Sequence, residues 1–347
     1  MSQRQDGMKT IASPRDRPHF RLQPIHLRAV IGLAVLIVSV GLMLRLDLVA
    51  VAVAIGQAHV GVASLALLLN LLYLAIRGVR WWLLLRSVGG KMSIFQAARI
   101  SSIGVLMSSL YPGLGETARI MLLQRNGVTF FNATVVTVEE RLVDTAGIGF
   151  FFAIGLVAAP AFVSQSGILS LSVAVQGVSI GLIILVILTG IVLFSPTGSI
   201  EARYWRWVAS VRRIVVVFTQ RLQASAVTLM RVPGLALSIL VTTIVSHLLA
   251  ILVGWLTALA FGLSVPLAII TLMVVTLSLG IGLVPSPLGI GVYQATGLAM
   301  LGGYCPNPEY TIAVATALQA INYGAAVLAA LAAVMFGVHP RSVSRLV

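Results

Sequence analysis

Long apolar runs, separated by short polar and basic stretches, make up most of this chain of 347 residues. A helix needs about 20 apolar residues to cross the hydrocarbon core of a bilayer, and runs near this length recur throughout the sequence. The runs that we expect to cross the membrane are 29–44, 60–76, 131–160, 171–194, 234–261 and 310–336. The pattern therefore predicts an all-α, polytopic membrane protein with about six full spans.

Two further apolar segments, 93–111 and 266–284, are each followed by a break rich in proline and glycine. The break residues are Pro112, Gly113 and Gly115 in the first segment and Pro285, Pro287, Gly289 and Gly291 in the second. The apolar piece after the first break, 117–123, is too short to cross a core of about 30 Å at about 1.5 Å per residue. We therefore expect two membrane hairpins, the first entering from the cytoplasm and the second from the opposite side.

Each expected hairpin is followed by a long unbroken helix, which indicates an inverted-topology repeat. Within a transmembrane domain of 29–338, the first half comprises 60–194 and the second half 234–337, joined by a basic loop at 195–231. Paired Pro/Gly-broken segments in corresponding positions of two halves point to a substrate site near the middle of the membrane.

The composition agrees with a membrane protein. Hydrophobic residues make up 59% of the chain and charged residues only 9%, and the mean hydropathy is +1.05. Soluble domains carry about 25% charged residues, so an ordinary cytosolic enzyme is excluded. With one cysteine and scattered histidines, the sequence offers no metal or disulfide motif, and we expect neither a metal nor another cofactor.

The formal net charge of +14 sets the expected orientation. Basic residues gather in a polar tail at 1–28, a cluster with tryptophans at 77–91, the loop 195–231 and a tail at 339–347. Lysine and arginine are enriched on the cytoplasmic side, so both tails are predicted to be cytoplasmic and the protein to lie in the cytoplasmic (inner) cell membrane. We expect no nucleic-acid partner, because no nucleic-acid module is present and the arginines lie beside apolar spans.

The basic segment 201–222 has an amphipathic pattern. Arg203, Arg206 and Arg213 share one helical face, opposite Trp207 and Phe218. This pattern predicts a helix on the inner leaflet that contacts anionic lipid, and an ordinary positive-inside loop is the alternative.

Ionisable residues also occur inside the apolar region. They are Glu116, Arg119, Glu140, Arg141 and Asp144, with Glu139 beside them at an expected interfacial position. If the helix begins near Asn132, Glu140 lies about 12 Å and Asp144 about 18 Å along it. A charge at that depth costs at least about 2.5–3.5 kcal/mol unless it is paired or hydrated.

Three interpretations of this cluster remain open. The first is a polar cavity where Arg119 and Arg141 hold a phosphate and the carboxylates orient them. The second is a set of structural ion pairs without a ligand, and the third is a helix that starts deeper, leaving 139–141 at the interface. In the second half, Gln294, Gln319 and Asn322 are candidates for lining the same cavity or for bonds between helices.

Several motifs resemble those of the lysylphosphatidylglycerol synthase transmembrane-region family, whose members are described as flippase-like. The motifs are Arg80-Trp81-Trp82-Leu83-Leu84, Tyr111-Pro112-Gly113-Leu114-Gly115-Glu116-x-x-Arg119, Glu140-Arg141-x-x-Asp144 and Val284-Pro285-Ser286-Pro287-x-Gly289-Ile290-Gly291-Val292. The resemblance covers roughly 28–338. It implies an integral membrane protein whose partner is a phospholipid or a polyprenyl-linked lipid.

The resemblance favours a flippase or related lipid transporter. In the synthases a soluble C-terminal domain transfers the amino acid, and we expect this chain to lack it because it ends after its last span. Two alternatives remain: a membrane-embedded transferase acting on a lipid phosphate, and an accessory subunit of a separate transferase.

Overall fold

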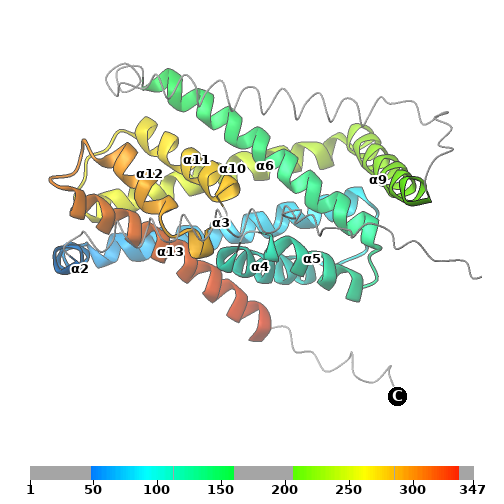
Figure 1. Cartoon of the computed structure of the whole chain (residues 1–347), viewed down its shortest axis with the longest axis horizontal. Coiled ribbons are helices and arrows are strands. Elements are labelled where there is room, and N and C mark those ends of the chain that lie inside the picture. Colours follow the sequence, from blue (N-terminus) through cyan, green and yellow to red (C-terminus); the bar gives the residue numbers. More distant parts are fainter. Residues whose placement is uncertain (1–47, 112, 160–205, 285, 336–347) are drawn as a thin grey trace, which may run out of the picture.

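The computed structural model describes residues 48–111, 113–159, 206–284 and 286–335. Every regular element in these ranges is a helix (Figure 1). The helices are α2 (Leu48–Gly56), α3 (Val60–Ser87), α4 (Ile94–Leu110), α5 (Leu114–Arg125), α6 (Phe130–Ala158), α9 (Arg206–Arg231), α10 (Pro233–Ala260), α11 (Leu267–Leu283), the 3-10 turn η1 (Pro287–Gly289), α12 (Val292–Leu301) and α13 (Pro308–Met335). The expected spans 29–44 and 171–194, both tails, Pro112 and Pro285 lie outside the described residues.

Four of these helices, α3, α6, α10 and α13, are long and apolar enough to cross a membrane. Each has 28 or 29 residues, or about 42 Å at about 1.5 Å per residue, more than the hydrocarbon core requires. Large apolar side chains on their outer faces are exposed, among them Leu68, Val157, Leu237 and Leu331. The prediction of an all-α polytopic membrane protein is therefore confirmed.

Two helix boundaries differ from the expectation in ways that affect the site. The helix α6 begins at Phe130, because the hydroxyl of Thr129, rather than the side chain of Asn132, caps its first turn and accepts a hydrogen bond from the Asn132 N–H. The helix α3 does not end before the basic cluster but continues to Ser87. Arg77 and Arg80 therefore lie within a long helix.

Both broken segments form helical hairpins, α4–α5 and α11–η1–α12. That these hairpins turn back within the membrane stays a prediction. The second arm of each begins directly after a glycine with a left-handed backbone, Gly113 at φ +93° and Gly291 at φ +88°. Only glycine adopts this conformation without a steric penalty, so each break depends on it. The side from which each hairpin enters the membrane stays a prediction.

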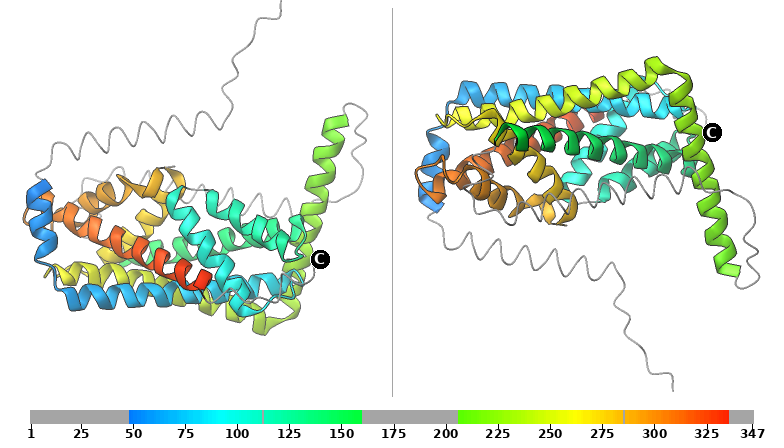
Figure 2. Two further views of the ribbon diagram at one scale, coloured as in Figure 1. Left: turned by 90° about the horizontal axis from the view of Figure 1, so that it is seen from below. Right: turned by 90° about the horizontal axis from the view of Figure 1, so that it is seen from above.

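The described helices form two similar groups of opposite direction (Figure 2). In chain order, the helices of α3–α6 have 28, 17, 12 and 29 residues, and those of α10–α13, the 3-10 turn aside, have 28, 17, 10 and 28. The N–H of His59, before α3, donates to the carbonyl of Ala260 at the end of α10, so these helices are antiparallel. The start of α4 bonds the end of α13 through Arg99 and Ala333, and the start of α11 packs on the end of α6. In each of these contacts, the start of a helix in one group meets the end of a helix in the other group, as an inverted repeat requires.

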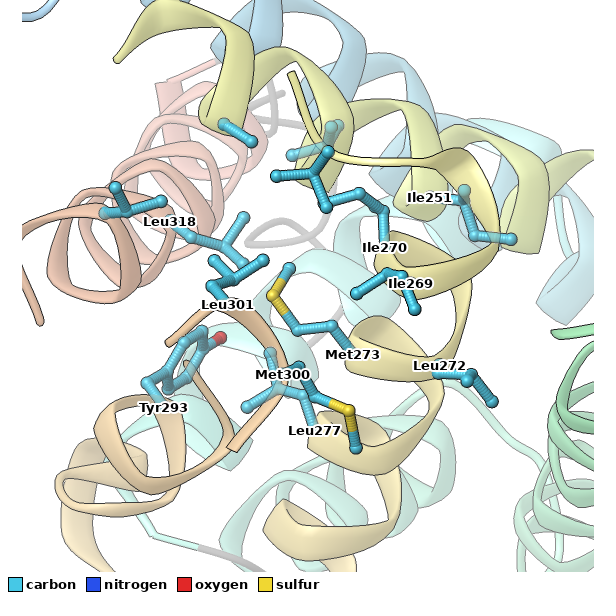
Figure 3. Packing of buried hydrophobic residues seen from close by; sticks show 14 of the residues in the cluster. Ile251, Ile269, Ile270, Leu272, Met273, Leu277, Tyr293, Met300, Leu301 and Leu318 are labelled. Carbon is cyan, nitrogen blue, oxygen red and sulfur yellow. The ribbon is translucent and has the colours of Figure 1, made fainter. Parts of the chain in front are cut away.

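Apolar packing holds the helices together. One cluster joins α10, α11, α12 and α13, with Ile270, Met273 and Leu301 at its centre (Figure 3). A second surrounds Trp81 and Leu84 of α3 and lies beside the charged residues. In lipid, close packing rather than exclusion of water stabilises such contacts.

Candidate functional site

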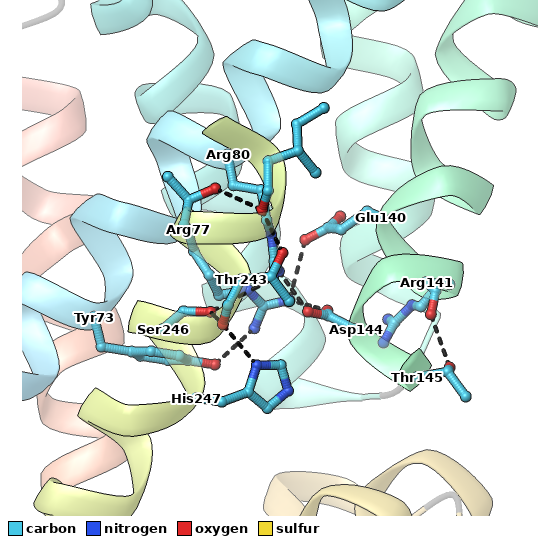
Figure 4. Close-up of polar contacts among 12 residues, drawn as sticks. Tyr73, Arg77, Arg80, Glu140, Arg141, Asp144, Thr145, Thr243, Ser246 and His247 are labelled. Atoms are coloured by element: carbon cyan, nitrogen blue, oxygen red, sulfur yellow. Dashed lines mark hydrogen bonds and ion pairs between the residues drawn. The ribbon is translucent and has the colours of Figure 1, made fainter. Parts of the chain in front are cut away.

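A network of charged side chains lies where α3, α5, α6 and α10 meet (Figure 4). Its carboxylates come from α6, where Glu140 and Asp144 are one turn apart and share a face. Its arginines come from α3 and α5. Pairing with these arginines is the condition under which both carboxylates remain charged away from water.

Arg119 of α5 pairs with Glu140. The Arg119 Nη1 lies 2.5 Å from Glu140 Oε2, and the two side chains are only 3% and 2% exposed. The absence of a side chain at Gly104 makes room for this arginine, because a Cβ there would overlap it. The guanidinium also lies 5.8 Å from the ring centre of Trp81.

Asp144 binds two arginines of α3. The Arg80 Nη2 lies 2.5 Å from Asp144 Oδ1, and the Arg77 Nη2 lies 3.3 Å from Asp144 Oδ2. Arg80 is 1% exposed, and its Nη1 also approaches the hydroxyls of Thr243 and Ser246 on α10, at 3.5 Å each. The network therefore joins both halves of the repeat.

Arg77 connects the two carboxylates. Besides Asp144, its Nη2 reaches Glu140 Oε1 at 3.1 Å, while its Nη1 donates to the Tyr73 hydroxyl. Sequence reasoning assigned Arg77 and Arg80 to the headgroup level and missed their place in the site. The available signal was their spacing of three residues in a helix, which puts both arginines on one face, as the spacing of four residues does for the two carboxylates.

Glu116 and Arg141 form a separate ion pair between α5 and α6. Arg141 is 57% exposed, so this pair lies at the margin of the buried network. Of the five predicted residues, the structure brings Arg119, Glu140 and Asp144 together. Arg141 binds Glu116, whereas Arg119 binds Glu140, so the two arginines belong to different ion pairs.

The buried network carries more positive than negative charge. Three arginines, Arg77, Arg80 and Arg119, face two carboxylates, which leaves an excess of one positive charge. Among the described side chains, the Nε–H group of each of these arginines is buried without a hydrogen-bond acceptor. Guanidinium groups with spare donors suit a phosphate, because the planar guanidinium can donate two parallel hydrogen bonds to two phosphate oxygens. In the same ranges, no three His, Cys, Asp or Glu side chains are grouped to hold a metal.

The comparison with known families agrees with this architecture. The family model described as "Lysylphosphatidylglycerol synthase TM region" matches residues 29–330, which include every helix of the site. The chain belongs to this family. A comparison with curated proteins finds no match. Family membership makes this a multi-pass membrane protein associated with lipid modification or transport.

In this family member, the side chain of Glu139 is buried between helices. It is 6% exposed, and its Oε2 lies 3.2 Å from the hydroxyl of Ser87 at the end of α3. The α6 helix begins at Phe130, so Glu139 and Glu140 lie well inside it and are buried among the helices, while their depth in the membrane stays a prediction.

Polar residues of the second half occupy positions equivalent to the charged ones. Glu116 and Gln294 are both third in the short arms, and Arg141 and Gln319 are both twelfth in the long helices. Gln294 donates to Gln319 at 2.9 Å, in the place of the ion pair of the first half. Asn322, equivalent to Asp144, accepts a hydrogen bond from Asn70 at 2.8 Å. All three predicted second-half residues therefore make bonds between helices.

Proposed function

We propose that this protein moves a phospholipid or polyprenyl-linked lipid across the membrane and binds the phosphate of its head group at Arg77, Arg80 and Arg119. The observation that carries the proposal is the excess positive charge of these arginines together with their unused Nε–H donors. Buried ionisable groups in a membrane segment are costly, and function is the usual reason for keeping them.

The carboxylates have a clear part in such a cycle. Glu140 and Asp144 hold the arginines in place when no lipid is bound, and a phosphate competes with them for the same guanidinium donors. Because Arg119 lies on the short arm of the first hairpin, exchange of its partner from Glu140 to phosphate loosens α5 from α6. Two hairpins of opposite direction then serve as alternating gates on either side of the site.

The test measures lipid movement in proteoliposomes that contain the purified protein and a fluorescent phosphatidylglycerol. A membrane-impermeant quencher reports the lipid in the outer leaflet. We expect Arg119→Gln and Arg80→Gln to slow movement about 10- to 100-fold, the loss corresponding to a hydrogen bond between charged partners. Arg125→Gln, on the same helix as Arg119 but exposed, is the matched control and should retain the full rate.

Other results would point to different functions. Full lipid movement by Arg119→Gln contradicts the proposal. A chemically altered lipid after incubation would instead indicate the membrane-embedded transferase. Movement that requires a second purified protein would indicate the accessory subunit.

A further inference from the structure

The carboxyl of Glu139 is separate from the ion-pair network. It lies next to Glu140 in sequence, but consecutive helical residues point about 100° apart, so it faces the end of α3 and the helix α9. There it meets Ser87 of α3, which in turn contacts Ser225 of α9. All three side chains are buried.

The charged groups whose side chains the structure describes on the surrounding helices are occupied elsewhere or exposed. They are Arg77, Arg80 and Arg86 on α3, Glu116, Arg119 and Arg125 on α5, Glu140, Arg141 and Asp144 on α6 itself, Arg221 and Arg231 on α9, and His247 on α10, whereas α11 has none. Arg86 stacks on Trp82, and His247 contacts the Thr243 carbonyl and the Phe151 ring. Arg125, Arg221 and Arg231 are exposed. In the described ranges, hydroxyl groups rather than cations are the polar partners of Glu139.

Three polar atoms surround the hydroxyl of Ser87, which has a single hydrogen to donate. The Ser87 Oγ lies 2.6 Å from the Leu84 carbonyl oxygen, 2.7 Å from the Ser225 Oγ and 3.2 Å from Glu139 Oε2. A hydroxyl has one hydrogen to donate and two lone pairs to accept with. Ser87 donates to the Leu84 carbonyl, which has no hydrogen of its own, and Ser225 donates to Ser87. With the Ser87 hydrogen directed at the Leu84 carbonyl, the nearer of its two acceptors, the longer contact with Glu139 Oε2 is open to a hydrogen carried by the carboxyl.

We infer that Glu139 is a proton-binding site and that its proton is bound in this conformation. A neutral carboxyl donates to the second lone pair of Ser87 and completes the group of hydroxyls. A buried carboxylate without a cation would instead carry a large desolvation cost. The proton therefore fastens α6 to α3 and, through Ser225, to α9.

Proton binding at this place has a consequence for lipid movement, which rests on the proposed function. Any opening of the first half that moves α6 away from α3 and α9 brings Glu139 into contact with water, where a glutamate carboxyl is deprotonated at neutral pH. Closure takes a proton up again. Lipid movement is then coupled to proton exchange through this residue.

Infrared spectroscopy of the protein in lipid tests the proton site directly. We expect the carbonyl stretching band of a protonated carboxyl near neutral pH, absent in Glu139→Gln and unchanged in the control Glu309→Gln, which lies in the first turn of α13. Glutamine keeps a donor to Ser87, so this variant should fold. Between the pH at which Glu139 ionises in the unfolded chain and the higher pH at which it ionises in the folded protein, the wild type loses up to about tenfold in its folded-to-unfolded ratio per pH unit relative to Glu139→Gln, and above that range the loss levels off. The same band in Glu139→Gln overturns the proton site.

The transport assay separates this inference from the proposed function. We expect a rate that depends on pH in the wild type and not in Glu139→Gln. The same pH dependence in both proteins overturns the coupling. If neither protein moves lipid but the carboxyl band disappears in Glu139→Gln, the proposed function fails and the proton site is retained.

Discussion

Replacing Glu140 with glutamine tests whether the buried network is an electrostatic unit. The change leaves the guanidinium of Arg119, 3% exposed, without its carboxylate, while Arg77 keeps Asp144. Removing one partner of a buried pair costs about 3–5 kcal/mol because the remaining charge stays in a medium of low dielectric constant. Since proteins are stable by about 5–15 kcal/mol, this is a large fraction of the total.

Two further variants give this prediction its controls. Glu116→Gln breaks the pair with Arg141, whose side chain is 57% exposed, and should cost clearly less than Glu140→Gln. The double variant Glu140→Gln/Arg119→Gln removes the unpaired charge as well and should recover most of the stability lost in the single variant. Unfolding in mixed micelles, followed by circular dichroism, measures all three against the wild type. The reasoning is refuted if Glu140→Gln lies within about 1 kcal/mol of the wild type, or if the double variant is as unstable as the single one.

Three other predictions concern packing, topology and the second hairpin. Gly104→Ala places a Cβ against the side chain of Arg119 and should lower the free energy of unfolding by about 1–3 kcal/mol. Gly61→Ala, whose Cβ meets open space, is the control and should not lower it. Thermal unfolding of the two variants and the wild type measures the difference. Burial raises the pKa of the Cys305 thiol, so a smaller fraction of it is thiolate at a given pH. Labelling by a membrane-impermeant maleimide should therefore be slow near neutral pH and faster as the pH rises. This labelling should occur only from the non-cytoplasmic side, and labelling from the cytoplasmic side contradicts the predicted orientation. Gln319→Leu removes a donor to a carbonyl of the second hairpin tip, and faster amide hydrogen exchange at that tip, without change at the first hairpin, is the expected result.

Much of the architecture follows from local properties of the sequence. Long apolar runs must form helices in lipid, because no water satisfies the backbone groups. The glycines at 113 and 291 mark the breaks because glycine adopts a positive φ without strain. The four-residue spacing of Glu140 and Asp144 puts both carboxylates on one face of α6.

The identity of their partners was not a local property. Arg77 and Arg80 are more than sixty residues from the carboxylates they bind, and sequence alone assigned them to the membrane surface because α3 was expected to end before them. Arg141, adjacent to Glu140, looked like a member of the same group, yet it faces outward to Glu116. A one-residue step turns a side chain by about 100° on a helix, so neighbours in sequence enter different environments.

The sequence by itself therefore determined that this protein is a helical membrane protein with two broken segments and a set of charges in an apolar setting. These features depend on hydrophobicity, glycine conformation and helical spacing, which act over a few residues. The tertiary structure alone decided that three arginines face two carboxylates, that the second half repeats the positions with neutral amides, and that Glu139 is enclosed by serines of α3 and α9. Those results depend on which helix faces meet, and that is set by the packing of the whole bundle.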